Sequence, residues 1–286
     1  MPHLLAVIAV YIIFFSALFL ISFWLLPLLW QQLVAFFSNL PQIINNGQLL
    51  LVSLHNKYPA FISLAWLKQM TSGAAGQVTD LGKFVFTFSR ASITGILSLT
   101  IYVVLVPILI FFFLKDSTIL IKWAEHFLPK KHNVLSKVWV ELGEKIGSYV
   151  KGKVIEILIV GFVSWVVFSF AGLNYALLLG ALVGLSVIVP YAGAIVVTIP
   201  VVIVGLVKWG LTAHFLYLMI AYGVIVALDA NVLVPLLFSE AMNLHPAAIL
   251  IGILVFGSLG GFWGVFFAIP LLTLCNILLK VWPRSE

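Results

Sequence analysis

The chain has 286 residues, of which 63% are hydrophobic and only 8% charged, with a mean hydropathy of +1.22. This composition excludes a soluble globular protein of this length and indicates a polytopic membrane protein. The net charge of +6 would favour a nucleic-acid partner in a soluble protein. Here the basic residues lie mostly in one loop and at the C-terminus, so we expect no nucleic-acid partner and interpret the charge as a signal of membrane topology. The 14% of aromatic residues and the 21 glycines favour an all-α transmembrane helical bundle.

The first part of the chain contains two uncharged apolar segments separated by a more polar stretch. Segment I runs from residue 4 to about residue 26, and we predict that it ends at Pro27. Residues 27–92 mix polar side chains with short apolar stripes at helical spacing, which predicts an external segment of amphipathic surface helices. Segment II, residues 93–114, is long enough to span a bilayer and stops abruptly at Lys115.

Residues 115–153 form a predicted cytoplasmic loop that carries eight of the fifteen lysines and arginines. Between Leu135 and Val150, apolar residues recur at intervals of three and four, with charged residues opposite. This pattern favours an amphipathic helix on an anionic membrane surface, and the alternative is a helix that packs against a soluble partner. Segment III follows as a short span, residues 154–171. Glu156 lies one turn after Lys153, which predicts an ion pair at the membrane interface.

Residues 174–207 contain no charged side chain. As one helix this stretch would be about 50 Å long, against about 30 Å for the hydrocarbon core of a bilayer. We predict a break in the sequence Pro-Tyr-Ala-Gly, because Pro190 removes a backbone donor and Gly193 permits unusual dihedral angles. Irregular backbone inside a membrane is tolerated where protein buries it or where it lines a cavity, so Pro190, Tyr191, Gly193 and Asn174 are candidates for a substrate or ion path. The alternative is a proline kink that only helps the helices to pack.

Segment V, about residues 211–238, contains Asp229, the only acidic residue well inside an apolar segment. A carboxylate near the bilayer centre costs about 2.5 to 3.5 kcal/mol, so such a group usually faces a cavity or the interior of the bundle. We predict that Asp229 binds a proton or Na⁺ and that Asn231 lies beside it on the path. In a regular helix the two side chains point to different faces, so they converge only if the backbone unwinds locally. Alternatively, Asp229 lies near the outer interface or in a subunit contact.

Segment VI, residues 247–275, is apolar and rich in glycine. Small residues let transmembrane helices approach closely, and we expect a close-packing surface beside the path. Its glycines are Gly252, Gly257, Gly260, Gly261 and Gly264, and we expect the last four to form this surface.

The distribution of basic residues then predicts the topology. If the stretch 174–207 is one crossing, the chain has six spans and eleven of its fifteen basic residues are cytoplasmic, including Lys208 and Lys280. Two full crossings would place Lys208, Lys280 and Arg284 outside. We therefore predict a single crossing with a broken helix, and both termini in the cytoplasm.

The motifs of several enzyme classes are absent from the sequence. There is no GxxxxGK[ST] phosphate loop, no HExxH and no GxSxG, so we expect neither ATP hydrolysis nor hydrolase activity. The single cysteine, Cys275, lies in an apolar segment and provides neither a disulfide nor a cysteine metal site. We expect no enzyme activity, no cofactor and no metal, and any active transport would use an ion gradient.

Seven short motifs, in order between about residues 93 and 272, resemble the autoinducer-2 exporter family, also called PerM-type permeases. They are Leu114-Lys115-Asp116, Leu128-Pro129, Tyr149-Val150-Lys151-Gly152, Pro190-Tyr191-Ala192-Gly193, Asn231-Val232-Leu233-Val234-Pro235, Leu244-His245-Pro246, and Gly260-Gly261-Phe262-Trp263-Gly264 followed by Ala268-Ile269-Pro270. The resemblance implies a helical protein of the bacterial inner membrane that forms a homo-oligomer. Some members are linked to export of the autoinducer-2 signal and others to Na⁺/H⁺ exchange, and members typically carry about eight spans where this chain reads as six.

Together these observations predict a single permease domain, residues 1–286, with the lipid bilayer and a small-molecule or ion substrate as its partners. The expected function is export of a small solute, an autoinducer-2-like signal, coupled to an ion gradient. A Na⁺(Li⁺)/H⁺ antiporter, a passive channel and a non-transporting membrane scaffold remain as alternatives.

Overall fold

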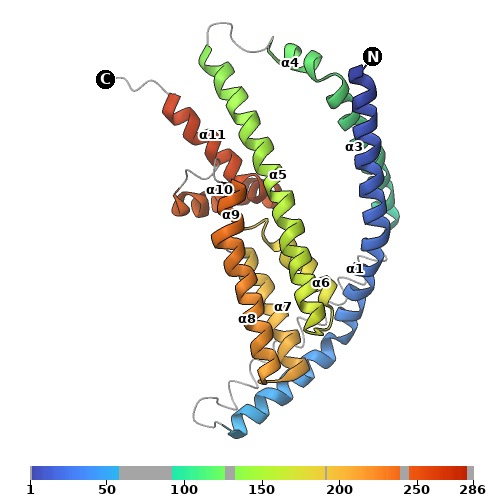
Figure 1. Ribbon diagram of the computed structural model, residues 1–286, viewed down its shortest axis with the longest axis vertical. Coiled ribbons are helices and arrows are strands. Elements are labelled where there is room, and N and C mark those ends of the chain that lie inside the picture. Colours follow the sequence, from blue (N-terminus) through green and yellow to red (C-terminus); the bar gives the residue numbers. More distant parts are fainter. Residues whose placement is uncertain (1, 58–91, 126–132, 191, 239–244, 282–286) are drawn as a thin grey trace. The chain divides into compact units, whose positions relative to one another are not determined.

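The computed structural model describes residues 2–57, 92–125, 133–190, 192–238 and 245–281. Regular structure in these residues is entirely helical, which confirms the predicted all-α class. The chain forms two compact units, Met1–Lys131 and His132–Glu286 (Figure 1). Among the described residues, five helices are long and apolar enough to cross a membrane, or six if a bent pair counts as one span. Tyr191 and the amphipathic helices predicted between residues 58 and 91 lie outside the described residues.

The first unit begins with one long helix, α1 (Pro2–Lys57). The prediction that segment I ends at Pro27 is wrong, because α1 continues through Pro27 and Pro41. A proline inside a helix removes one hydrogen bond and bends the axis, but in an apolar surrounding the neighbouring backbone groups still need helical partners. The helix therefore curves along its length and does not end at the proline (Figure 1).

Segment II forms α3 (Ser92–Lys115), as predicted, and it is followed by the short helix α4 (Ser117–Glu125). The two are bent by 82° at Asp116, whose carbonyl accepts bonds from the backbone amides of Ile119 and Leu120. The rings of Tyr11 and Phe111, 5.6 Å apart, are one contact that joins α3 to α1. These contacts hold the first unit together.

The second unit begins with α5 (Asn133–Phe170), a continuous helix of 38 residues. The predicted boundary between a surface helix and a span that starts at residue 154 is wrong, because the backbone is helical throughout. The charge of Lys153 does not interrupt the helix, because this charge is paired with an acidic side chain within the bundle. Its ammonium group is 2.7 Å from the carboxylate of Glu156, and both side chains are buried. The predicted ion pair therefore exists, and it is buried inside the bundle.

The stretch after α5 is broken as predicted, into α6 (Ala176–Ser186) and α7 (Ala192–Trp209). The predicted single crossing is wrong. The Lys208 ammonium donates to the Gly172 carbonyl and, over 3.0 Å, to Oδ1 of Asn174, so α7 returns to the end of α5 from which α6 departs. With 11 residues, α6 is about 16 Å long and too short to cross a bilayer. The stretch is a helical hairpin. Lys208 lies near the C-terminal end of α5, opposite to the end where the lysine-rich predicted loop enters this helix.

Glycines allow α6 to pack directly on α5. A Cβ atom on Gly184 would lie 2.7 Å from the α-carbon of Gly161, and one on Gly180 would lie 2.6 Å from the backbone nitrogen of Trp165. Such close approach is the usual role of small residues between helices in membranes. It fixes the hairpin against α5.

Segment V forms one span, as predicted, made of α8 (Ala213–Leu228), a π-helical turn η1 (Asp229–Leu233) and α9 (Val234–Phe238). It runs antiparallel to α5. Phe238 contacts Gly152 near the start of the α5 span, and the ring of Tyr222 lies 5.9 Å from that of Phe168 near its end.

Segment VI is α10 (Pro246–Phe266) and α11 (Ala268–Val281), and it is not the single continuous segment that we predicted. The chain reverses at Gly261, whose φ of 55° and ψ of −135° are non-helical. After this turn Gly264 packs against the carbonyl of Phe256, and Gly252 packs against the side chain of Leu272. The two arms are therefore antiparallel, a second helical hairpin. Its first arm, residues 246–260, is about 22 Å long.

Candidate functional site

A cavity of about 380 Å³ lies in the second unit, where the broken elements meet. Its wall comes from α5, the break between α6 and α7, the span of α8, η1 and α9, and the two arms of the second hairpin. The lining residues with ionisable or phenolic groups are Tyr149, Lys153, Glu156 and Asp229. The other lining residues are Val187, Val189, Pro190, Ala194, Ile195, Val226, Ala230, Val234, Phe238, Ile249 and Ile269. The cavity is thus mostly apolar, with a few charged groups.

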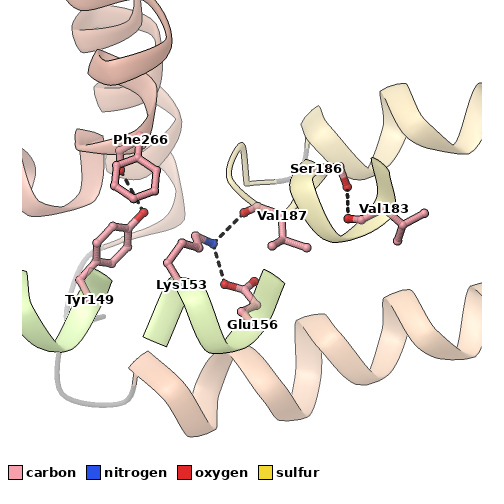
Figure 2. Close-up of polar contacts among 7 residues, drawn as sticks. All are labelled: Tyr149, Lys153, Glu156, Val183, Ser186, Val187 and Phe266. Atoms are coloured by element: carbon pink, nitrogen blue, oxygen red, sulfur yellow. Dashed lines mark hydrogen bonds and ion pairs between the residues drawn. The ribbon is translucent and has the colours of Figure 1, made fainter. Parts of the chain in front are cut away.

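Lys153 is the centre of the polar contacts in this wall. Its ammonium group donates to Glu156 and to the carbonyl of Val187, both over 2.7 Å, and lies 5.2 Å from the centre of the Phe238 ring. Figure 2 shows the side chain directed between Glu156 and Val187. Lys153 and Glu156 are only 3% and 1% exposed. A buried ion pair is tolerated when further hydrogen bonds complete it, and the Val187 carbonyl supplies one. Lys153 therefore joins α5 to the break and to α9.

Asp229 is the first residue of the π-helical turn and lies half-buried in the cavity wall. Its Oδ1 atom is buried, and no donor in the described part of the chain reaches it. Single π-helical turns occur mostly within longer helices and often at functional sites. Asp229 therefore presents one buried hydrogen-bond acceptor, Oδ1, to which no described residue donates.

The structure brings together only some of the site residues expected from the sequence. Pro190 lines the cavity with Asp229, whereas Gly193 is buried against Ser186 and Asn231 turns its amide to the Ala227 carbonyl over 2.8 Å. Asn174 lies at the far end of the first hairpin, where it binds Lys208.

The glycines expected to pack beside the path lie in the second hairpin. A Cβ atom on Gly257 would lie 2.9 Å from the Val265 side chain, and Gly264 also packs between the arms. Gly260 and Gly261 lie at the turn, where no described atom would come within 4 Å of an added Cβ atom.

Tyr149 is a wall residue that the sequence analysis did not single out. Its side chain is 2% exposed, and its hydroxyl donates to the carbonyl of Phe266 over 3.1 Å (Figure 2). Its ring packs with Phe238, Ile249 and Ile269 in the core beside the cavity. The signal that could have found it was its position one turn before Lys153, on the same face of α5. Tyr149 fastens the second hairpin to α5.

Broken helices that meet at a charged cavity inside an apolar bundle are characteristic of the binding sites of membrane transporters. The fold and the cavity thus define a multi-pass membrane transport protein. The chain belongs to the AI-2E transporter family, whose model matches residues 1–284.

Relatives in several bacteria support this assignment. PerM of Escherichia coli (strain K12), named as a candidate permease, is 41% identical over 277 residues, which cover 97% of this chain and 78% of PerM. YueF of Bacillus subtilis (strain 168), named as a candidate transport protein, is 28% identical over 94% of this chain and 74% of its own length. YrrI of the same organism, also named as a candidate transport protein, is 22% identical over 98% of this chain and 78% of its own length.

Proposed function

We propose that this transporter exports a small polar solute, an autoinducer-2-like signal, across the bacterial inner membrane, and that an ion gradient drives the export. The observation that carries the proposal is the meeting of two backbone irregularities at one charged cavity. These are the break after α6 and the π-helical turn at Asp229, and the second hairpin completes the wall with Ile249 and Ile269. Irregular backbone exposes amide and carbonyl groups that a solute can bind.

The size and lining of the cavity suit a small ligand. At about 380 Å³ it falls at the lower end of the range of about 300 to 1,000 Å³ that is usual for small-molecule sites. Its apolar wall with a few polar groups is also usual for such sites. The choice of autoinducer-2 as the solute rests on the family to which the chain belongs.

Ion coupling is proposed from Asp229. A carboxylate among apolar side chains in a membrane is costly unless something neutralises it, and a bound proton or Na⁺ would do so. The proposed path includes Asp229 and Pro190 in the wall. The path would include Asn231, Gly193 or Asn174 only if the helices that carry these residues moved.

A Na⁺(Li⁺)/H⁺ antiporter is the second candidate function. It is favoured by the buried Oδ1 of Asp229, which a cation or a proton could occupy in turn. The two candidates differ in one measurable respect: an antiporter moves Na⁺ without any organic solute.

The test is transport by the purified full chain in liposomes. We would measure uptake of labelled autoinducer-2, and uptake of Na⁺ against a pH gradient, for the wild type, for Asp229→Asn and for Glu144→Gln. Glu144 is an exposed acid on α5 outside the cavity lining, so its variant controls for the loss of a carboxylate. We expect autoinducer-2 flux that falls at least tenfold in Asp229→Asn and persists in Glu144→Gln.

Other outcomes would overturn the proposal. Na⁺ flux without solute flux would establish the antiporter, and solute flux without a second ion gradient would establish a passive channel. No flux of either solute from folded protein would favour a membrane scaffold.

A further inference from the structure

The charges that line the cavity do not balance. Of the lining residues, α5 contributes Lys153, Glu156 and the phenol of Tyr149, and the π-helical turn contributes Asp229. The phenol is engaged with the carbonyl of Phe266 and carries no charge. The lining residues from the α6–α7 break, α7, α8, α9, α10 and α11 are apolar. One ammonium group therefore faces two carboxyl groups.

Lys153 is already committed to one of these carboxyl groups. Its hydrogen bonds go to Glu156 and to the Val187 carbonyl, and its third neighbour is the Phe238 ring. Oδ1 of Asp229 is buried and receives no bond from any described residue. Among the described residues, the arrangement thus contains one hydrogen-bonded ion pair and a second carboxyl group whose buried oxygen has no hydrogen-bond donor.

An unpaired carboxylate in such a setting needs one positive charge. Asp229 is half-buried, and its buried oxygen Oδ1 lacks a donor among the described residues, so a bound cation or proton would stabilise it. Because Lys153 can neutralise only one of the two acids, the number of positive charges still required is one.

We propose that the cavity holds one exchangeable positive charge, a proton or a Na⁺ ion, at Asp229, and that Lys153 sets this number at one by neutralising Glu156. The inference deepens the proposed function, because it assigns the coupling site and its capacity. Glu156 and Lys153 act as positioning residues: they fix how much charge Asp229 must bind, and Asp229 binds it.

The count of charges gives an expectation for each variant. In Glu156→Gln, Lys153 is free to neutralise Asp229, so this variant needs no bound cation. In Asp229→Asn only the ion pair of Lys153 and Glu156 remains, so this variant needs none either. Lys153→Met leaves two acids and needs two. The double variant Lys153→Met with Glu156→Gln leaves Asp229 alone and needs one again.

The experiment measures bound positive charge on the purified full chain in detergent, without any solute. Radioactive Na⁺ binding counts sodium ions per protomer, and infrared absorption of protonated carboxyl groups counts protons. The sum of the two is expected to be one for the wild type and for the control Glu144→Gln. It is expected to be zero for Glu156→Gln and for Asp229→Asn, two for Lys153→Met and one for the double variant. Comparison of the number of bound Na⁺ ions with the number of protonated carboxyl groups shows whether the bound charge is Na⁺ or a proton.

A sum of one in Glu156→Gln, or a sum of zero in the double variant, would overturn the inference. If Lys153→Met fails to fold, these two variants still decide it, because the double variant replaces the buried pair by uncharged groups of similar size. Failure of the proposed function is distinguished by the liposome assay: absent solute flux with the expected sums would reject export and keep the charge site.

Discussion

Gly193 faces the carbonyl oxygen of Ser186 so closely that no side chain fits between them. The contact lies where the first hairpin turns from α6 into α7, beside the Val187 carbonyl that Lys153 binds. The hairpin therefore depends on a residue without a Cβ atom at this position.

Gly193→Ala is expected to destabilise the protein by about 1 to 3 kcal/mol, because the added methyl group must displace the backbone of Ser186. Thermal unfolding in detergent measures the change as a lower midpoint. Gly223→Ala in α8 is the matched control, since no described atom lies within 4 Å of its added methyl group, and its midpoint should not fall. Equal midpoints for the two variants would contradict the close contact.

The turn of the second hairpin offers a test of backbone conformation alone. Gly261 has a φ of 55°, which side chains rarely tolerate, whereas its neighbour Gly260 is helical, and neither has a described atom within 4 Å of an added Cβ. Gly261→Ala should therefore cost about 1 to 3 kcal/mol of stability, and Gly260→Ala should not. The comparison uses the same unfolding assay. A smaller loss for Gly261→Ala than for Gly260→Ala would mean that the chain does not reverse there.

The return of α7 predicts which positions share a side of the membrane. In a Cys275→Ser background, Ala171→Cys and Lys208→Cys should react with an impermeant thiol reagent in the same vesicle orientation. Glu144→Cys should react in the opposite orientation, because the part of α5 after Glu144 rises about 39 Å, more than the thickness of the hydrocarbon core. Labelling of residues 171 and 208 from opposite sides would restore the single crossing that we predicted from the basic residues.

Tyr149→Phe should lower stability by about 1 kcal/mol, because it removes the partly buried hydrogen bond to the carbonyl of Phe266. The hairpin of α10 and α11 would then be held less firmly to α5. Tyr217→Phe is the control, since Tyr217 on α8 is 68% exposed. A midpoint for Tyr149→Phe as high as that of the control would show that this hydrogen bond contributes nothing to stability.

Several features of the fold and site could be predicted from the sequence because their causes are local. Composition determined the helical membrane class. The missing donor of Pro190 marked the break after α6, although the helix already ends at Ser186. The spacing of three residues between Lys153 and Glu156 predicted their ion pair. The isolated acid in segment V identified Asp229, which lines the cavity.

What only the tertiary structure decided is the direction of the chain after each break and, through it, the assembly of the cavity. A helix that continues across the membrane and a helix that turns back bury the same apolar residues in lipid, so hydropathy does not distinguish them. The choice is made by contacts distant in sequence, such as Lys208 with Asn174 and Tyr149 with Phe266. These contacts follow no local period. They bring Asp229 to the same cavity as the ion pair of α5, which no spacing in the sequence could indicate.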